Sequence, residues 1–154
     1  MATTLKQVVN SAITLLSTEL NSLANNTMCS AGSAINNVAS GTANADGYVR
    51  GSVQLSLATY SGTPTANTGV SIWFLKSVDG GSTYEDGSSS VTPARRPDLV
   101  IPVRALASGP QVITKQCWIP AGYFKPIAKN DGTGITFASS GNTIKVETNT
   151  DQSV

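Results

Sequence analysis

The 154 residues suit one domain with a single hydrophobic core and are too few for two cores of ordinary size. Only 12% of the residues are charged and the formal net charge is +1, which excludes a strong electrostatic basis for binding nucleic acid or an anionic lipid surface. No apolar run approaches the roughly 18 residues of a membrane-spanning helix, and the first residues lack the pattern of a secretory signal, so a membrane is not an expected partner.

An amphipathic helix is predicted over residues 3–24. Apolar residues recur there at gaps of four, three, four, four and three: Leu5, Val9, Ala12, Leu16, Leu20 and Leu23. This spacing places them on one face of a helix, and Thr4 with Gln7 fits a capping box at its start. Because such a helix is marginal alone, residues 1–26 are expected to pack on the chain's own sheet or on a neighbouring subunit. Three of the apolar residues are therefore candidate interface residues: Leu5, Val9 and Leu16.

Residues 27–154 are predicted to form a β domain. Residues 49–57 alternate between apolar and polar side chains, as a half-buried strand does. Further strands are predicted over residues 33–35, 70–75, 99–103, 112–119, 123–129, 135–137 and 143–148. Turn signals about every 8–12 residues, with no helical pattern between the strands, indicate about seven or eight antiparallel strands in a sandwich, a jelly roll or a small barrel.

The strongest strand pattern lies in residues 70–87. Four bulky apolar residues follow one another at positions 72–75, so both faces of this strand are expected to be covered. The strand leads into Ser77-Val78-Asp79-Gly80-Gly81-Ser82-Thr83-Tyr84, which resembles the Asp-box turn of sialidase-like propellers. A propeller is excluded, because the box occurs once in a chain too short for four blades. The pattern predicts a structural turn in which Asp79 caps backbone N–H groups, formed by Asp79, Gly80, Gly81 and Thr83.

The residue types that usually carry catalysis or bind metals form no recognisable site. The chain has no histidine, and Cys29 and Cys117 lack a metal-binding spacing. Its nine acidic residues lie mostly in predicted turns and loops and indicate no facing pair, and no glycine-rich loop leads into a lysine that would hold a phosphate. No catalytic residue, metal site or cofactor is therefore expected, and the protein is not expected to be an enzyme.

The basic pair Arg95-Arg96 lies between Pro93 and Pro97 in a polar stretch. Two interpretations stay open for it. The arginines are either part of an exposed loop, or candidate interface anchors, since arginine is enriched at binding hot spots.

Five stretches, taken in their order along the chain, resemble a family of small virion proteins of tailed bacteriophages. They are residues 17–24 (STELNSLA), 32–37 (GSAINN), 77–87 (SVDGGSTYEDG), 98–104 (DLVIPVR) and 138–144 (ASSGNTI). The family is similar to capsid decoration, or cement, proteins. The resemblance implies a β jelly roll, here with one N-terminal helix, that sits on the outside of the phage head and clamps neighbouring major capsid subunits.

The expected function is therefore that of a non-enzymatic virion protein on the capsid exterior, assembled in the host cytoplasm. Its implied partners are the major capsid protein and further copies of itself, with a dimer favoured and a trimer as the other option. The alternative is a tail or head-fibre module that binds a host surface glycan. Five aromatic residues would then be available to stack on sugar rings: Tyr60, Trp73, Tyr84, Trp118 and Tyr123. An exposed pair of aromatic side chains would favour the alternative, and two buried tryptophans would weaken it.

Overall fold

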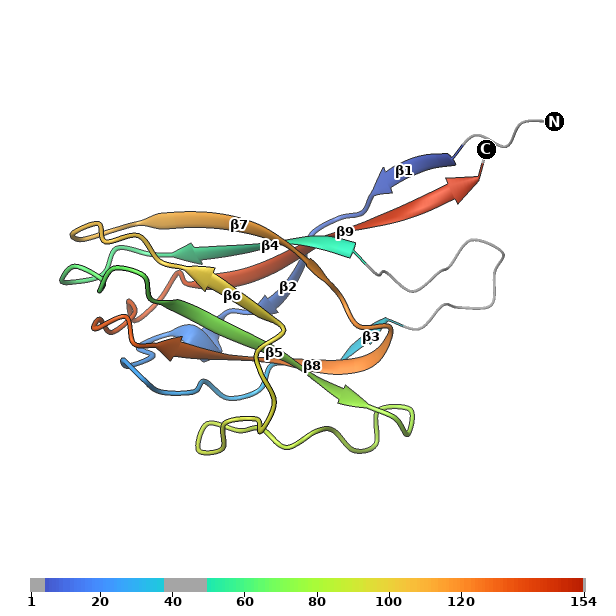
Figure 1. The fold of residues 1–154 in the computed structure, drawn as a ribbon, viewed down its shortest axis with the longest axis horizontal. Coiled ribbons are helices and arrows are strands. Elements are labelled where there is room, and N and C mark those ends of the chain that lie inside the picture. Colours follow the sequence, from blue (N-terminus) through green and yellow to red (C-terminus); the bar gives the residue numbers. More distant parts are fainter. Residues whose placement is uncertain (1–4, 38–49, 154) are drawn as a thin grey trace.

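The structure is a computed structural model, and it describes residues 5–37 and 50–153. Within these residues the chain forms nine strands and one 3₁₀ turn, and two antiparallel sheets face each other (Figure 1). The strands are β1 (Leu5–Val9), β2 (Ile13–Leu16), β3 (Ile35–Asn37), β4 (Arg50–Leu57), β5 (Gly69–Ser77), β6 (Leu99–Pro102), β7 (Gln111–Trp118), β8 (Gly122–Asp131) and β9 (Thr143–Ser153), and the turn is η1 (Thr18–Leu20). The prediction of a mainly β fold with antiparallel strands is confirmed.

The strand pairs are nested along the chain. In the first sheet the order is β1-β9-β4-β7, with β2 also paired to β9; in the second it is β3-β8-β5-β6. Consequently β2 pairs with β9, β3 with β8, β4 with β7, and β5 with β6, so that each pair encloses the next. The first sheet thus contains the first and last of these eight strands, and the second sheet contains the innermost pair.

The core lies between the two sheets. Strand β4 contributes alternate residues to it, with Val53, Leu55 and Leu57 buried and the intervening polar residues turned outward. From the second sheet, the ring of Phe74 packs edge-on against that of Phe124, with centroids 5.2 Å apart. Apolar contact of this kind provides most of the stability of a sandwich.

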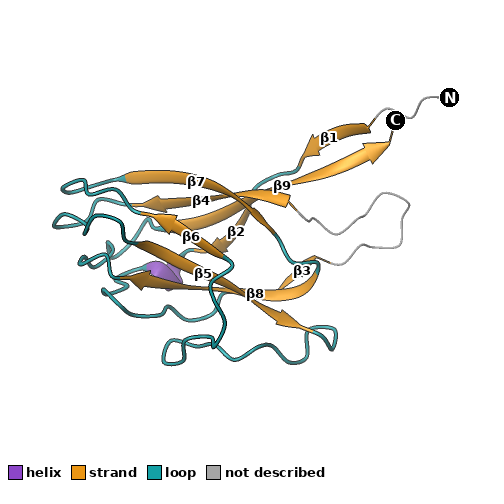
Figure 2. Cartoon of the chain, in the orientation of Figure 1, coloured by secondary structure: helices purple, strands orange, loops and turns teal. Residues whose placement is uncertain are grey.

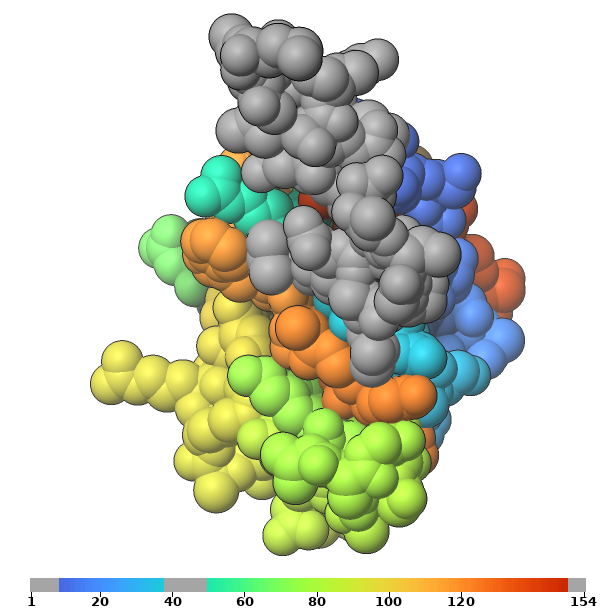
Figure 3. All heavy atoms as spheres, turned by 90° about the vertical axis from the view of Figure 1, so that its right-hand side faces the viewer, coloured from blue at the N-terminus to red at the C-terminus, as the bar shows by residue number. Residues whose placement is uncertain are grey.

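Strand β5 is covered on both faces, as its apolar run predicts. All residues from Gly69 to Leu75 are buried. One face turns toward the core through Phe74, whereas Trp73 on the other face lies beneath the segment 78–98 and donates its indole N–H to the carbonyl of Arg95 at 3.0 Å. The segment 78–98, coloured green to yellow, forms the lower part of the end of the molecule seen in Figure 3.

The predicted helix over residues 3–24 is wrong for the residues that the structure describes. They form β1, β2 and the single turn η1, which is the short helical ribbon in Figure 2. Strand β9 presents a long edge that both strands pair with, and the β-branched residues of this segment suit such pairing. A register shift between Thr14 and Leu16 lets the adjacent Leu15 and Leu16 both be buried, so the apolar residues here do not alternate as they do in a regular strand.

Leucines near the start of the chain contribute to the core. Leu15, Leu16, Leu20 and Leu23 belong to one core cluster with residues of both sheets, so residues 13–23 are an integral part of the sandwich.

The strand predicted at 135–137 is absent. Ile135 and Phe137 are buried in an irregular segment, where the carbonyl of Ile135 accepts a hydrogen bond from the Asn130 side chain at 2.8 Å.

Strand β9 continues past the sandwich as a two-stranded ribbon, which we call the terminal arm. Its residues from Asn149 to Ser153 pair with β1, whereas residues 143–149 pair with β4. The arm extends away from the sandwich at the upper right of Figure 1. At its base, Asn10 donates both its backbone N–H (2.9 Å) and its side-chain amide (3.1 Å) to the carbonyl of Thr148, which fixes the point where the arm leaves the sheet.

Candidate functional site

The turn after β5 is held by the side chain of Asp79, as its sequence pattern predicts. One carboxylate oxygen accepts the backbone N–H groups of Ser82 (3.0 Å) and Thr83 (2.9 Å), and the other accepts the Thr83 hydroxyl at 2.6 Å. Gly80 and Gly81 have φ values of 73° and 92°, which other residues rarely adopt. The hydrogen bonds, that of the Thr83 hydroxyl first, hold the pKa of Asp79 well below its usual range. The carboxylate is therefore occupied by hydrogen bonds within the turn and is not available as an acid or base.

Two tyrosines pack around this turn. A Cβ atom added at Gly81 would lie 3.0 Å from the ring of Tyr123 and 3.2 Å from the hydroxyl of Tyr84, so both tyrosines lie against the same glycine. The ammonium of Lys125 is 4.4 Å from the centre of the Tyr84 ring, within cation–π range. The side chains of Tyr84 and Tyr123 are both half-buried. They contribute to the packing of the turn and do not form an open aromatic platform.

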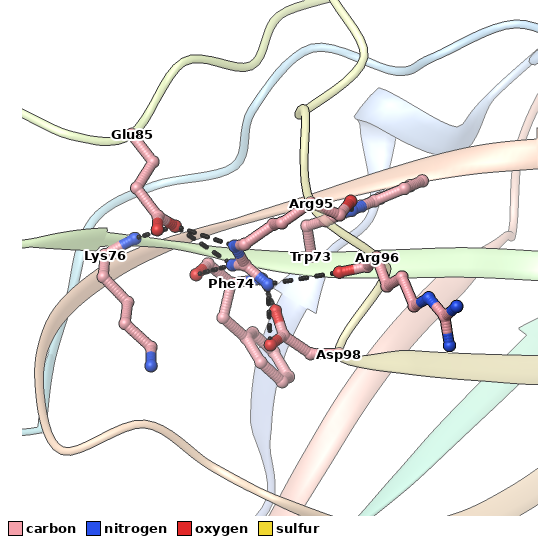
Figure 4. A network of polar contacts seen from close by, with 7 residues as sticks. All are labelled: Trp73, Phe74, Lys76, Glu85, Arg95, Arg96 and Asp98. Carbon is pink, nitrogen blue, oxygen red and sulfur yellow. Dashed lines mark hydrogen bonds and ion pairs between the residues drawn. The ribbon is translucent and has the colours of Figure 1, made fainter.

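Arg95 holds the segment 78–98 onto β5 through a network that we call the Arg95 clamp (Figure 4). Its guanidinium donates to the carbonyl of Phe74 at 2.7 Å and forms ion pairs with Glu85 (3.0 Å) and Asp98 (2.8 Å). The same two carboxylates accept backbone N–H groups of β5, Asp98 from Phe74 at 2.7 Å and Glu85 from Lys76 at 3.1 Å. Each of the three charges therefore also bonds the backbone of β5.

The pKa directions in the Arg95 clamp follow from these contacts. Burial opposes the charge on Glu85, but the Lys76 N–H and the Arg95 guanidinium together lower the pKa of the carboxyl below its usual value. Burial also opposes the charge on Arg95, yet Asp98 and Glu85 raise its pKa. Glu85 and Arg95 are thus both charged at neutral pH, and the clamp holds the segment 78–98 on β5.

The basic pair of the sequence has two different environments. Arg95 lies in the clamp, whereas Arg96 is exposed and its guanidinium is directed away from the clamp (Figure 4). The backbone carbonyl of Arg96 accepts a hydrogen bond of 3.5 Å from Arg95. Of the two candidate anchors, Arg96 is the one whose side chain is directed to the surface.

The candidate interface residues near the start of the chain are also separated. Leu16 is 1% exposed and lies in the core, so it cannot meet a partner. Val9, at the end of β1, is 59% exposed. Leu5 begins β1 and is paired through its backbone with Ser153 at the far end of the terminal arm.

The thiols are not positioned as nucleophiles. Cys29 and Cys117 are both free, and burial raises the pKa of each thiol to about 11. Cys29 accepts the backbone N–H of Ala128 at 3.2 Å, so it bridges the segment before β3 to β8. Among the described residues, no three His, Cys, Asp or Glu side chains converge where a metal ion could bind, and no helix has the length and apolar character needed to span a membrane.

A surface of which sequence analysis named only Trp118 as a candidate binding residue lies where β4, β7 and β9 meet. Trp118 is 66% exposed, and the guanidinium carbon of Arg50 is 5.0 Å from the centre of its ring, within cation–π range. Beside this pair is a hollow of about 400 Å³, lined by Arg50, Gly51, Gln116, Cys117, Trp118 and Asn149. The alternation of residues 112–119 already placed Trp118 on the same face as Gln116, but the register that pairs Arg50 with Trp118 and with Asn149 is not readable from local sequence.

The aromatic residues divide accordingly. Trp73 and Tyr60 are 3% and 4% exposed, whereas Trp118 faces solvent. The hydroxyl of Tyr60 donates to the carbonyl of Leu106 at 2.9 Å and contacts the side chain of Gln111. Only one of the two tryptophans is therefore buried, and Tyr84 and Tyr123 are half-buried. Among these five aromatic residues there is thus neither the buried tryptophan pair that would weaken glycan binding nor an exposed aromatic pair that would favour it.

In comparisons with known proteins, no family model, curated protein or solved structure matches the chain.

Proposed function

We propose that the protein is a non-enzymatic virion protein that decorates the outer surface of a phage capsid by binding subunits of the major capsid protein. The terminal arm is the observation that carries the proposal. Its two strands leave a stiff sandwich, and a two-stranded ribbon is marginally stable alone in water. Contact with a neighbouring subunit would stabilise such an arm, which suits a protein whose task is to link subunits.

The sandwich itself supports a jelly roll, which the family resemblance implies. A chain whose strands pair first with last, second with second-last and so on behaves as one long hairpin wrapped into two sheets. Two Greek keys wound in this way define the jelly roll. Viral capsid and lectin domains both use this architecture, so the fold is compatible with capsid binding and with glycan binding.

The outward face of the first sheet is suited to close packing. After the charged Arg50, β4 carries Ser52, Gln54 and Ser56 on this face, which are half-buried and uncharged. Lys145 and Glu147 of β9 lie opposite Gln54 and Ser52 and carry opposite charges. Weak contacts of such a surface gain strength when a capsid presents many equivalent sites to a protein that binds as an oligomer. We propose that the protein acts as a homo-oligomer, with a dimer favoured, on the virion exterior after assembly in the host cytoplasm.

Co-sedimentation with capsids assembled without this protein tests the proposal. The full chain is expected to bind until a fixed number of copies per capsid is reached. A variant lacking residues 1–9 keeps Asn10 at the base of the arm but loses β1, and it is expected to bind more weakly. Val78→Ser is the matched control, since Val78 is 99% exposed in the Asp79 turn and away from the arm. A full chain that never pellets with capsids would refute the proposal.

A second candidate function is favoured by Trp118. An exposed indole beside planar amide and guanidinium groups of Gln116, Asn149 and Arg50 can stack on a sugar ring and bond its hydroxyls. The protein would then be a tail or head-fibre module that binds a host surface glycan. A glycan array separates the two functions: binding to a glycan that Trp118→Ala abolishes would favour the second, and an array without binding would favour capsid decoration.

A further inference from the structure

The edge strands of the two sheets are protected to different degrees. Exposed edges offer unpaired backbone groups to other chains, so proteins keep them short or interrupt them with proline, bulges or lysine. In the second sheet β3 has three residues, and β6 has four and ends at Pro102. In the first sheet β2 has four residues and a register shift. Strand β7 has eight residues, so it is the longest of these edges.

Strand β7 lacks the usual protection. Its register with β4 runs without a shift from Gln111 to Trp118, and no proline lies between these residues. The single lysine in the strand, Lys115, donates its ammonium to the carbonyl of Val100 in β6 at 3.0 Å. This lysine therefore occupies an open carbonyl of β6 and does not guard the edge of β7. Among the described residues, β7 pairs with β4 only.

Exposed apolar side chains are frequent in β6, β7 and the connection between these strands. Eight large apolar residues of the described chain are exposed, and four of them lie on β6, β7 or the connection between these strands. They are Val100 (41%), Leu106 (45%), Val112 (59%) and Trp118 (66%). Strand β7 itself contributes two of them, Val112 and Trp118, so it combines an edge with exposed apolar surface that is unfavourable to hydrate.

We propose that β7 of one copy pairs antiparallel with β7 of a second copy, which joins the two first sheets into one continuous sheet. A strand that pairs with itself about a two-fold axis makes the same contacts twice, as most homodimers do. The outward residues of β7 are Val112, Thr114, Gln116 and Trp118, and none of them is charged. In a pair centred on Thr114, Lys115 lies opposite Ile113 of the other copy, so no charged residue of β7 faces its own copy. A partner strand with its own charge pattern would not need such a neutral face. This dimer deepens the homo-oligomer of the proposed function and rests on it. Sedimentation of the isolated chain tests the dimer, whereas co-sedimentation with capsids tests capsid binding, so the failure of one can be told from the failure of the other.

Sedimentation velocity of the full chain over a wide concentration range tests the dimer. We expect a monomer–dimer equilibrium in which Val112→Lys weakens association by about tenfold or more, because the change places a lysine at two symmetric positions in the uncharged contact between the strands. Val91→Lys is the matched control, since Val91 is 47% exposed in the segment 78–98 and distant in sequence from β7. Association unchanged by Val112→Lys, or a chain that stays monomeric at every concentration, would overturn the proposal.

Amide hydrogen exchange identifies the mode of association. In an antiparallel strand alternate N–H groups point to opposite sides, so every second amide of β7 does not donate to β4. We expect these amides to exchange slowly in the concentrated dimer and fast on dilution, while the amides of β5 stay slow at both concentrations. A dimer in which the outward amides of β7 gain no protection would contradict pairing through this edge.

Discussion

Strands β5 and β7 have nearly the same length, nine and eight residues, and both contain large apolar side chains. Strand β5 lies between β6 and β8, and its residues from Gly69 to Leu75 are buried on both faces. Strand β7 has one partner among the described residues and exposes Val112 and Trp118. Apolar residues of β5 therefore stabilise the fold, whereas those of β7 remain available for contacts with another molecule. Substitutions in the two strands should separate stability from association.

The largest effect is expected for Phe74→Ala. Phe74 is fully buried and packs against Phe124, so its truncation removes apolar contact and leaves a cavity. We expect the free energy of unfolding to fall by about 3–5 kcal/mol, measured by urea denaturation. Phe74→Leu, which keeps most of the volume, should lose less. A loss below about 1 kcal/mol for Phe74→Ala would show that β5 does not anchor the core.

The next effect is expected for Arg95→Ala, which removes the Arg95 clamp from β5. The change removes the hydrogen-bond donor to the carbonyl of Phe74 and the cation that pairs with the carboxylates of Glu85 and Asp98. Because the side chain of Arg95 is 32% exposed, water compensates in part, and we expect a loss of about 1–2 kcal/mol. Arg96→Ala is the adjacent control and should leave the free energy of unfolding unchanged. Equal losses for the two variants would contradict the division of the basic pair.

Asp79→Ala should lower the melting temperature by a few degrees, because backbone N–H groups of Ser82 and Thr83 lose their acceptor. Asp79→Asn keeps one acceptor oxygen, so its melting temperature should lie between those of the wild type and Asp79→Ala. Since folding lowers the pKa of this carboxyl, its contribution is complete above the unfolded value of about 4 and is lost as the pH falls through the folded value. The difference between wild type and Asp79→Ala should therefore be constant near neutrality and shrink only in strong acid. A difference that instead grows on acidification would contradict this.

The smallest effect on stability is expected for Val112→Ala. The side chain is 59% exposed, so the free energy of unfolding should change by no more than about 0.5 kcal/mol in dilute solution, where the chain is monomeric. Denaturation at low and high protein concentration checks this. If β7 joins two copies, the wild type gains stability with concentration and Val112→Ala gains less. A large loss in dilute solution would show that Val112 belongs to the fold.

Sequence reasoning reached the parts of the fold that depend on local pattern. The alternation of residues 49–57 and the apolar run at 72–75 gave β4 and the buried β5, and the Asp79 turn followed from its own residue types. The helix prediction for the start of the chain was wrong because pairing with β9, more than 120 residues away, determines that Ile13 and Leu16 lie in a strand. The grouping of Arg50 and Asn149 around Trp118 could not be predicted for a related reason. It depends on the register of three strands, which local patterns do not specify.

The copy number of the chain in purified virions tests the proposed function most directly. Quantitative mass spectrometry of heads separated from tails gives its molar ratio to the major capsid protein. Capsid decoration predicts a fixed, simple ratio in the heads, set by the number of equivalent sites on the capsid. A few copies per virion, found with the tails and absent from the heads, would contradict it.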